Sequence, residues 1–449
     1  MTNGASGPMG GERPPAGTRP PTPGTRPNAE AKPPTSGRPA AGTREPDGPD
    51  HPALRGLAAV WLRANCPCAT CQDPGSGQRL VSITELPCDV TVTEVVASDA
   101  AVEVVFGPDG HRAVFGTGWL ARYGDPAVEH GPEPPAHDGT EPPARDGTEP
   151  PAQDGTGPPW QDDARTEDAK HLWAAADLGG ELPQGWWPRY LADPAHRRTS
   201  LSAVLTRGVV VLHDVPCVPG AVLAAAKSLG YVRETNYGRL FEVRAEPTPA
   251  NLAFTRLPIA PHTDNPYRDP VPTVQLLHCL HAADDGGEST FTDGFRAAAV
   301  LRSQDPAAFA CLTTTPVTFA YSDAATVLRA TGPMIGLDPR GRIRQIRFNG
   351  RSLAPVRLPA ARARSFYAAY RAFADRIAEP EAAMTARLSP GDCVIVDNTR
   401  VLHGRTGFAD GGGTRTMGRR HLQGCYADLD GLESAVAVLA RSEAGRAGS

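Results

Sequence analysis

Two short motifs that lie far apart in the chain place the strongest constraint on its fold. The tetrapeptide Pro-His-Thr-Asp occupies positions 261–264, and His403 follows 141 residues after His262 (403 − 262). In a β-strand, residues i and i+2 point to the same side, so His262 and Asp264 can reach one metal ion. His403 joins them only if a β-rich core returns near its own start, and the apolar run 393–397 is typical of a buried strand that leads into His403.

Two imidazoles and one carboxylate are a ligand set of non-haem iron. They hold one face of an octahedral Fe(II) and leave the other face open for a chelating cosubstrate and O₂. His262, Asp264 and His403 therefore predict an iron centre and oxidative chemistry. The tripeptide His-x-Asp alone is a weak signal, because these residue types often occur together on a solvated surface.

A second part of the predicted site is a clamp for a carboxylate. An arginine can form two parallel hydrogen bonds with a carboxylate, and on chemistry alone four candidates compete for this role: Arg405, Arg415, Arg419 and Arg420. Ser289 follows the glycine turn 286–287 and offers a hydroxyl donor beside a strand-like run. The alternative is a surface serine in a hairpin turn.

Several segments occur in an order that is typical of one enzyme family: HTDNPYRDP, VQLLHCL, GGESTFTDGF, DNTRVLHGR and RHLQGCYADLD. From about residue 61 to about residue 430, with one insertion, the chain resembles the Fe(II)/2-oxoglutarate oxygenases of the taurine dioxygenase (TauD/TfdA) superfamily. Within it, the chain resembles the γ-butyrobetaine and trimethyllysine hydroxylases.

The resemblance implies roles for the residues of the iron site. His262, Asp264 and His403 would bind Fe(II), and Arg420 would clamp the distal carboxylate of 2-oxoglutarate with Ser289 assisting. It also implies O₂ as a cosubstrate and ascorbate as a reductant. The implied fold is mainly β with flanking helices: a double-stranded β-helix, or jelly roll, preceded by a small β-rich zinc-binding domain.

Three cysteines near the start of the chain predict a second metal site. Cys66, Cys68 and Cys71 lie so close together that metal binding is favoured over disulfide pairing in a cytosol-like protein. His111 is a good candidate for the fourth ligand of a closed Cys₃His zinc site, which would stabilise a small domain. The family resemblance points to the same four residues. The alternative is a cluster of free thiols.

The resemblance also implies a substrate site. γ-Butyrobetaine hydroxylases hold a quaternary ammonium in an aromatic cage, and the matching positions are aromatic here: Tyr237, Phe241, Phe254 and Tyr426. The two phenylalanines replace a tryptophan and a tyrosine of familiar animal members, which predicts a less electron-rich cage. Asn251 and Asn349 match the amide donors for the substrate carboxylate. The alternatives are core packing for the aromatic residues and turn positions for the asparagines.

A cage with amide donors predicts a small zwitterionic substrate. γ-Butyrobetaine, hydroxylated to carnitine, is the leading candidate. Trimethyllysine, a trimethylammonium phosphonate or a specialised metabolite are alternatives within the same chemistry. From a different class, a non-catalytic jelly-roll binding protein is a further alternative, although such a protein would be expected to have lost part of the ligand set.

Composition divides the chain into four parts. Residues 1–55 are proline-rich, with 12 prolines in the first 50 positions, which predicts a disordered tail. Residues 124–159 repeat Glu-Pro-Pro-Ala-x-Asp-Gly-Thr with a period of eight, which favours a disordered linker over a binding array. The folded parts are then a zinc-binding domain at 56–123 and a jelly-roll dioxygenase domain at 160–445.

Patterns within the folded parts predict individual elements. Alternating or continuous apolar runs predict strands at 90–96, 101–106, 209–212, 274–277 and 394–396. Helices are expected at 219–228 and 360–377. A net charge of −5 without a basic stripe argues against nucleic acid or an anionic membrane as a partner. Without a leader or a long apolar run we expect a cytoplasmic protein. The sequence does not decide between a monomer and a homodimer.

Overall fold

The computed structural model of the protein describes residues 51–74, 77–124, 170–245, 255–323, 325–408 and 420–447. Most of the predicted tail and nearly all of the predicted linker lie outside these ranges. Four residues of the predicted site also lie outside them: Asn251, Phe254, Arg415 and Arg419.

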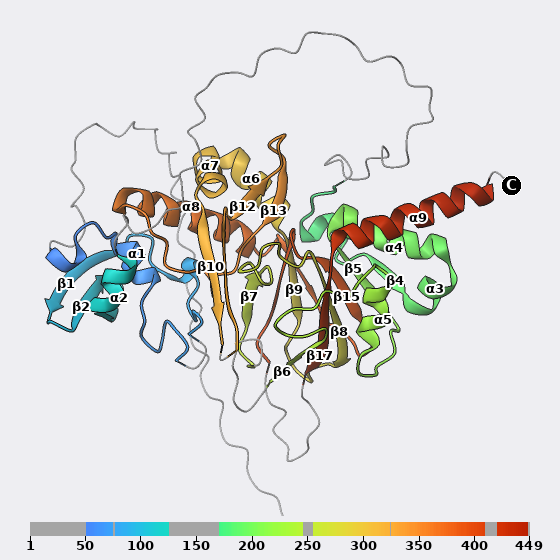
Figure 1. The fold of residues 1–449 in the computed structure, drawn as a ribbon, viewed down its shortest axis with the longest axis horizontal. Helices are drawn as coiled ribbons and strands as arrows, with labels where there is room; N and C mark the ends of the chain where they lie inside the picture. The colour runs from blue at the N-terminus through green and yellow to red at the C-terminus, as the bar shows by residue number, and fades with distance from the viewer. Residues whose placement is uncertain are drawn as a thin grey trace, which may run out of the picture. The chain divides into compact units, whose positions relative to one another are not determined.

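Two β-sheets lie at the centre of the larger folded part (Figure 1). The six-stranded sheet has the order β4-β5-β15-β8-β17-β6, and the four-stranded sheet has the order β14-β9-β16-β7. All neighbouring strands in them are antiparallel except the pair β4 and β5. The strands of the first sheet are β4 (Gln184–Trp186), β5 (Val209–His213), β15 (Cys393–Asp397), β8 (Val274–His281), β17 (His421–Ala427) and β6 (Phe241–Arg244). Those of the second are β14 (Ala383–Ala386), β9 (Ser289–Asp293), β16 (Val401–Arg405) and β7 (Ile259–His262).

Strand β15 shows why the central strands are apolar on both faces. Val394 and Val396 join a core between the two sheets that includes Phe291 of β9. Cys393 and Ile395, which point the other way, pack with residues of the helices that cover the six-stranded sheet. A strand covered on both faces needs a continuous apolar run rather than an alternating one. The expectation of a buried strand at 393–397 is therefore confirmed.

Helices cover the sheets in two groups (Figure 1). Those beside the six-stranded sheet are α3 (Trp187–Ala192), α4 (Pro194–Arg207), α5 (Ala221–Lys227) and α9 (Leu429–Ala447). Those of the second group are α6 (Gly294–Gln304), α7 (Pro306–Thr314) and α8 (Ala360–Ala378). In α8, apolar residues three and four apart, such as Phe366, Tyr370 and Phe373, are buried, which gives the helix one continuous core-facing side.

The N-terminal part forms a small module with one antiparallel sheet (Figure 1). Its elements are α1 (Ala59–Ala64), β1 (Thr91–Ala97), β2 (Ala101–Gly107), β3 (Arg112–Gly116) and α2 (Thr117–Tyr123). The Trp61 indole donates a buried hydrogen bond of 2.7 Å to the Val356 carbonyl, and the Asn65 amide donates one of 3.1 Å to the Tyr367 hydroxyl. The module and the helices α6 to α8 thus share one apolar core.

Two hairpins contain the remaining β-strands of the described residues. They consist of β10 (Val317–Ser322) with β11 (Val327–Gly332), and of β12 (Ile335–Leu337) with β13 (Ile343–Ile346). The predicted strands and helices are all present, with ends shifted by a few residues at most. A mainly β fold with flanking helices is confirmed, and two sheets around a shared core are consistent with a jelly roll. Within the described ranges, no helix has both the length and the apolarity that crossing a bilayer requires.

A buried ion pair joins the strands that carry the predicted site. Arg400, just before β16, donates two hydrogen bonds of 3.0 and 2.8 Å to the Asp293 carboxylate at the end of β9, and both side chains are fully buried. Arg400 also donates to the backbone carbonyls of Thr206 and His171. Because every polar group of this cluster is engaged, the pair holds the start of β16 in place ahead of His403.

Candidate active site

The fold brings His262, Asp264 and His403 together. His262 is the last residue of β7 and pairs directly with His403 of β16, so the two imidazole rings lie 4.5 Å apart. The Oδ1 atom of Asp264 lies 3.3 Å from the Nε2 atom of His262 and 3.8 Å from that of His403. One ligand atom from each residue lies within 4.8 Å of the others, a spacing that fits one metal ion.

Asp264 does not share a strand with His262, so the expectation that both residues lie in one strand is wrong. The strand ends at His262, and Asp264 lies in the bend that follows. Its backbone N–H donates to the Asn398 side-chain oxygen at 2.7 Å, and its carbonyl accepts from the Asn398 amide at 3.0 Å. Asn398 thus replaces the strand ladder as the partner of this backbone.

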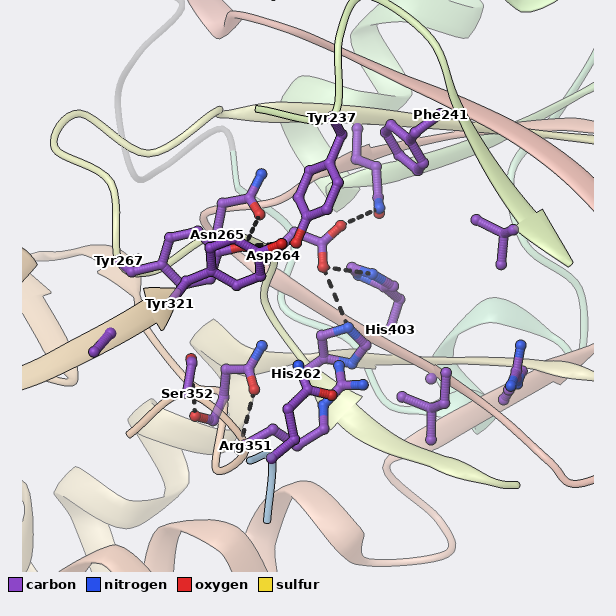
Figure 2. Close-up of a pocket in the computed structure, with 18 of the residues that line it drawn as sticks. Tyr237, Phe241, His262, Asp264, Asn265, Tyr267, Tyr321, Arg351, Ser352 and His403 are labelled. Carbon is purple, nitrogen blue, oxygen red and sulfur yellow. Dashed lines mark hydrogen bonds and ion pairs between the residues drawn. The ribbon is translucent and has the colours of Figure 1, made fainter. Parts of the chain in front are cut away.

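Neighbouring groups orient Asp264 and His262, two of the three ligands. The Tyr426 hydroxyl, at 2.8 Å, and the Gln275 amide both donate to Oδ2 of Asp264, which leaves Oδ1 facing the two imidazoles (Figure 2). The Nδ1 atom of His262 lies 3.0 Å from the Ala260 carbonyl, which favours a proton on Nδ1 and a lone pair on Nε2. Such outer partners fix the tautomer and direction of metal ligands.

Burial keeps both imidazoles in their neutral, metal-binding form. Desolvation is the main cause that lowers the pKa of His403, to about 3. Desolvation, followed by the charge on Arg351, also lowers the pKa of His262. For Asp264, burial alone would raise the pKa, but its close contacts with the two imidazoles and the hydrogen bond from Tyr426 hold it below its usual range. Two neutral imidazoles beside a carboxylate are the charge state that a divalent cation needs.

The triad opens onto a cavity of about 630 Å³. Its wall includes the predicted residues Tyr237, Phe241, Ser289, Asn349, Arg420 and Tyr426. The N-terminal module also contributes to the wall through Gln72, Gln78 and Tyr123. The volume is suited to small organic molecules rather than to a polymer.

Arg420 lies where a clamp for a carboxylate is expected. Its side chain is buried at the cavity wall, where Nε donates to the Gly287 carbonyl at 3.0 Å and Nη2 to the Ser289 hydroxyl at 3.4 Å. Ser289 is also buried, so the surface-serine alternative is wrong. Arg405 also lines the cavity, but its Nε and Nη2 donate to the Leu257 carbonyl. Its pKa falls to about 9 because of burial and the charges of Arg420 and Arg351.

Aromatic side chains gather on one side of the triad. The ring of Phe241 lies 5.0 Å from that of Tyr426 and 6.2 Å from that of Tyr237. Tyr267 and Tyr321, which sequence reasoning missed, extend this group: they stack at 5.1 Å, and the Tyr237 and Tyr267 hydroxyls lie 3.0 Å apart (Figure 2). The signal for Tyr267 was its place three residues after Asp264, whereas nothing in the local sequence distinguished Tyr321 from core filler.

Asn349 lies at the cavity wall, but most of its side chain is engaged. Its amide donates to the Thr263 carbonyl at 3.3 Å, and its side-chain oxygen accepts from the backbone N–H of Arg351 at 3.2 Å. This is the geometry of an Asx turn, in which the side chain holds the backbone two residues on. The turn interpretation thus applies to Asn349, with one amide proton remaining for a ligand.

The predicted zinc ligands also come together. The Nε2 atom of His111 lies 3.1, 3.5 and 3.6 Å from the sulfur atoms of Cys66, Cys68 and Cys71. All four ligand atoms lie within 4.8 Å of one another, which fits the edges of a tetrahedron around zinc. The hydrogen bond from Cys66, helped by Arg63, lowers the pKa of Cys71, which favours the thiolate form that binds a metal ion.

Comparison with known proteins identifies the family. Residues 176–426, more than half of the chain, match the family model described as taurine catabolism dioxygenase TauD, TfdA family. Residues 53–121 match the model described as gamma-butyrobetaine hydroxylase-like, N-terminal. The chain therefore belongs to the TauD/TfdA dioxygenase family. It is a dioxygenase whose N-terminal module is of the type found in gamma-butyrobetaine hydroxylase-like proteins.

Individual relatives cover most of the chain. It is 35% identical over 382 residues to gamma-butyrobetaine dioxygenase of Pseudomonas sp. (strain AK-1), covering 85% of this chain and 90% of that protein. It is 28% identical over 391 residues to gamma-butyrobetaine dioxygenase of Homo sapiens, again covering 85% and 90%. A trimethyllysine dioxygenase of Meyerozyma guilliermondii is 25% identical over 389 residues, covering 85% and 89%.

Proposed function

We propose that the protein hydroxylates a small trimethylammonium carboxylate, with γ-butyrobetaine as the leading substrate and carnitine as the product. The observation that carries the proposal is that the His262, Asp264 and His403 triad and a group of tyrosines line the same cavity. Fe(II) would be held by the triad, and 2-oxoglutarate and O₂ would be the cosubstrates. When bound, iron would activate O₂, which is the oxidant; one electron pair would come from 2-oxoglutarate, which leaves as succinate and CO₂, and the other from the substrate C–H bond that is hydroxylated.

The residues of the chain bind and orient the reactants. Arg420, supported by Ser289, offers a buried guanidinium for the distal carboxylate of 2-oxoglutarate. Gln275 and Tyr426 keep the Asp264 carboxylate directed at the imidazoles. A substrate held at both ends presents a chosen carbon to the oxidant, which is the contribution that positioning makes to such catalysis.

A tyrosine-rich cage would hold the trimethylammonium group. The negative ring faces of Tyr237, Tyr267 and Tyr321 attract a cation that is cheaply desolvated. These tyrosines compensate for the lower electron density of the Phe241 ring compared with that of a tryptophan. Phe254, the fourth predicted member, lies outside the described residues.

The first test is succinate release from the purified protein with Fe(II), ascorbate and 2-oxoglutarate. We compare γ-butyrobetaine, trimethyllysine and no added substrate. Strong stimulation by γ-butyrobetaine supports the proposal, whereas preferential stimulation by trimethyllysine favours the second candidate, which is the activity named for the Meyerozyma guilliermondii relative. Uncoupled turnover alone would redirect the search to a phosphonate or specialised metabolite. No turnover at all would favour the binding-protein alternative.

Replacing Tyr237 with alanine tests the cage. We expect the KM for γ-butyrobetaine to rise by about 5- to 30-fold, because a desolvated cation–π contact contributes roughly 1–2 kcal/mol. The KM for 2-oxoglutarate should change little. Tyr237→Phe keeps the ring and loses only the hydroxyl that lies 3.0 Å from that of Tyr267, so it is the matched control. Equal changes in both KM values in Tyr237→Ala would argue against the cage.

The Cys₃His cluster is proposed to hold a structural zinc ion. Four ligand atoms leave no coordination position open for a substrate, which is the arrangement of a structural site. Arg63 donates to the Cys71 sulfur at 3.3 Å and pairs with Asp109 at 3.0 Å, so the ligand is supported from outside. Gln72, next to Cys71, lines the cavity, which couples this metal site to the wall of the candidate active site.

Replacing Cys66 with serine is expected to release zinc and to weaken the module. The thermal midpoint should fall by about 5–10 °C, because each kcal/mol of lost unfolding free energy lowers the midpoint of a domain of this size by roughly 2–4 °C. The KM for the substrate should also rise, since the loop that carries Gln72 loses its anchor. Zinc content, calorimetry and kinetics at saturating Fe(II) measure these changes. Cys311→Ser, outside the cluster, is the control, and an unchanged zinc content would contradict the assignment.

Three further expectations stay proposals. They are the division into a tail at 1–55, a zinc-binding domain at 56–123, a linker at 124–159 and a dioxygenase domain at 160–445; a homodimer; and a cytoplasmic location. Limited proteolysis would test the domain boundaries, because cleavage is expected between positions 124 and 159. Light scattering would test the dimer.

A further inference from the structure

The cavity contains a cation that the chemistry described so far does not use. Arg351 lies in the loop after β13 and lines the cavity beside the triad. Its Nη1 atom is sealed from solvent and, among the described residues, meets no hydrogen-bond acceptor. A buried guanidinium nitrogen without an acceptor costs free energy, and a bound anion would offset this cost.

The loop that carries Arg351 is tied to the iron site. Thr263, between two of the predicted ligands, donates its backbone N–H to the Phe348 carbonyl at 2.8 Å and accepts from the Phe348 N–H on its hydroxyl at 3.0 Å. Asn349 donates to the Thr263 carbonyl and accepts from the Arg351 N–H. The guanidinium is thus positioned by a preorganised loop rather than by a mobile one.

The charge of Arg351 reaches the triad but is not neutralised there. Burial, only partly opposed by the Asp264 charge, lowers the pKa of Arg351 itself. Asp264 already accepts hydrogen bonds from Gln275 and Tyr426 and faces the imidazoles. Its carboxylate is therefore committed to the metal site, and an anion from outside the chain is the natural partner of Arg351.

The position of Arg351 relative to the aromatic group indicates which anion this is. In Figure 2, Tyr237 and Phe241 lie on one side of His262, Asp264 and His403, and Arg351 lies on the other side. A molecule whose cation sits among the tyrosines and whose acid pairs with Arg351 would extend across the triad. Arg420 and Ser289 already provide a separate buried donor pair for 2-oxoglutarate.

We propose that Arg351 binds the carboxylate of the substrate and thereby determines specificity for a zwitterion over a simple trimethylammonium cation. This inference rests on the proposed function and assigns its second recognition point. Asn349 is then a positioning residue, which holds the Arg351 backbone through its Asx turn. A planar guanidinium that donates two parallel hydrogen bonds explains selection of a carboxylate.

The experiment compares an acid with its neutral amide. Wild type and Arg351→Met are assayed for succinate release with γ-butyrobetaine and with its primary amide, and with trimethyllysine and its amide. Equilibrium binding of each compound is measured by calorimetry. In Arg351→Met we expect kcat/KM and affinity for the acid to fall by about 10- to 100-fold, the range that loss of a charge-assisted hydrogen bond gives. The values for the amide should change by less than about threefold.

Matched variants separate this role from others. Arg344→Met removes an exposed arginine from the neighbouring strand β13 and should leave the acid-to-amide ratio unchanged. Arg420→Met should raise the KM for 2-oxoglutarate instead. Arg351→Lys keeps the charge but not the planar fork, so its acid-to-amide ratio should fall between those of wild type and Arg351→Met. If Arg351→Met does not fold, as judged by its thermal midpoint, the lysine variant carries the test.

The outcomes distinguish the two proposals. If wild type binds and turns over neither γ-butyrobetaine nor trimethyllysine, the proposed function fails and this inference fails with it. If wild type accepts one of them but Arg351→Met loses acid and amide equally, only the role of Arg351 is overturned. A selective rise in the KM for 2-oxoglutarate in Arg351→Met would assign the guanidinium to the cosubstrate and would likewise overturn the inference.

Discussion

Replacing His262 with alanine is expected to abolish iron binding and 2-oxoglutarate turnover. Its Nε2 atom lies 3.3 Å from Asp264 Oδ1, and among the described residues only His403 completes this cluster. Changes in residues that merely orient metal ligands cost about 10- to 100-fold in metal affinity or activity, so loss of a ligand should cost more. Bound iron, measured by elemental analysis, and succinate release with and without substrate both check this outcome.

His281→Ala is the matched control for the iron prediction. His281 ends strand β8 of the other sheet, is exposed, and is not part of the cavity wall. Its loss should leave iron content and turnover close to those of wild type. Retained iron-dependent succinate formation in His262→Ala would remove His262 from the metal site.

Replacing Asp293 with asparagine is expected to destabilise the fold by about 3–5 kcal/mol, because it leaves the fully buried Arg400 charge without its partner. The carboxylate also accepts from the backbone N–H groups of Trp173 and Phe295, and an asparagine can accept only one of these bonds. Chemical denaturation monitored by circular dichroism measures the free energy of unfolding. Since Arg400 precedes the strand of His403, iron affinity should fall as well.

An exposed ion pair provides the comparison for Asp293. Arg112 and Glu103 lie 3.1 Å apart on the N-terminal sheet, and both side chains are at least 40% exposed. Glu103→Gln should change the free energy of unfolding by less than about 1 kcal/mol, as exposed pairs do. Similar losses in Asp293→Asn and Glu103→Gln would show that Arg400 finds other partners, and that burial of this pair does not hold β16 in place.

Local pattern was sufficient to predict several parts of the fold. The continuous apolar run at 393–397 predicted β15 because a strand covered on both faces has no solvent side. The run at 360–377 predicted α8 because its apolar residues recur every three or four positions. The motifs that contain His262, His403 and Arg420 predicted the family, which comparison with known proteins confirms.

Other features depend on contacts between distant segments. Asp264 leaves the strand of His262 because Asn398, 134 positions later, binds its backbone. Tyr321 reaches the cavity because its hairpin places its ring 5.9 Å from that of Tyr237. Neither pairing leaves a trace in the sequence near these residues, since a side chain that lines a cavity and one that fills a core have the same local pattern.

The sequence by itself therefore determined which chemical groups the protein has: two imidazoles and a carboxylate for iron, three thiols and an imidazole in a second cluster, and a guanidinium for a carboxylate. Only the tertiary structure decided how these groups face one another and which buried nitrogen atoms, among the described residues, lack a hydrogen-bond acceptor. Arg351 illustrates the difference, because its Nη1 atom is buried and has no hydrogen-bond acceptor among the described residues. Burial and unmet hydrogen bonding are properties of the packed molecule, so they are defined only after distant segments have come together.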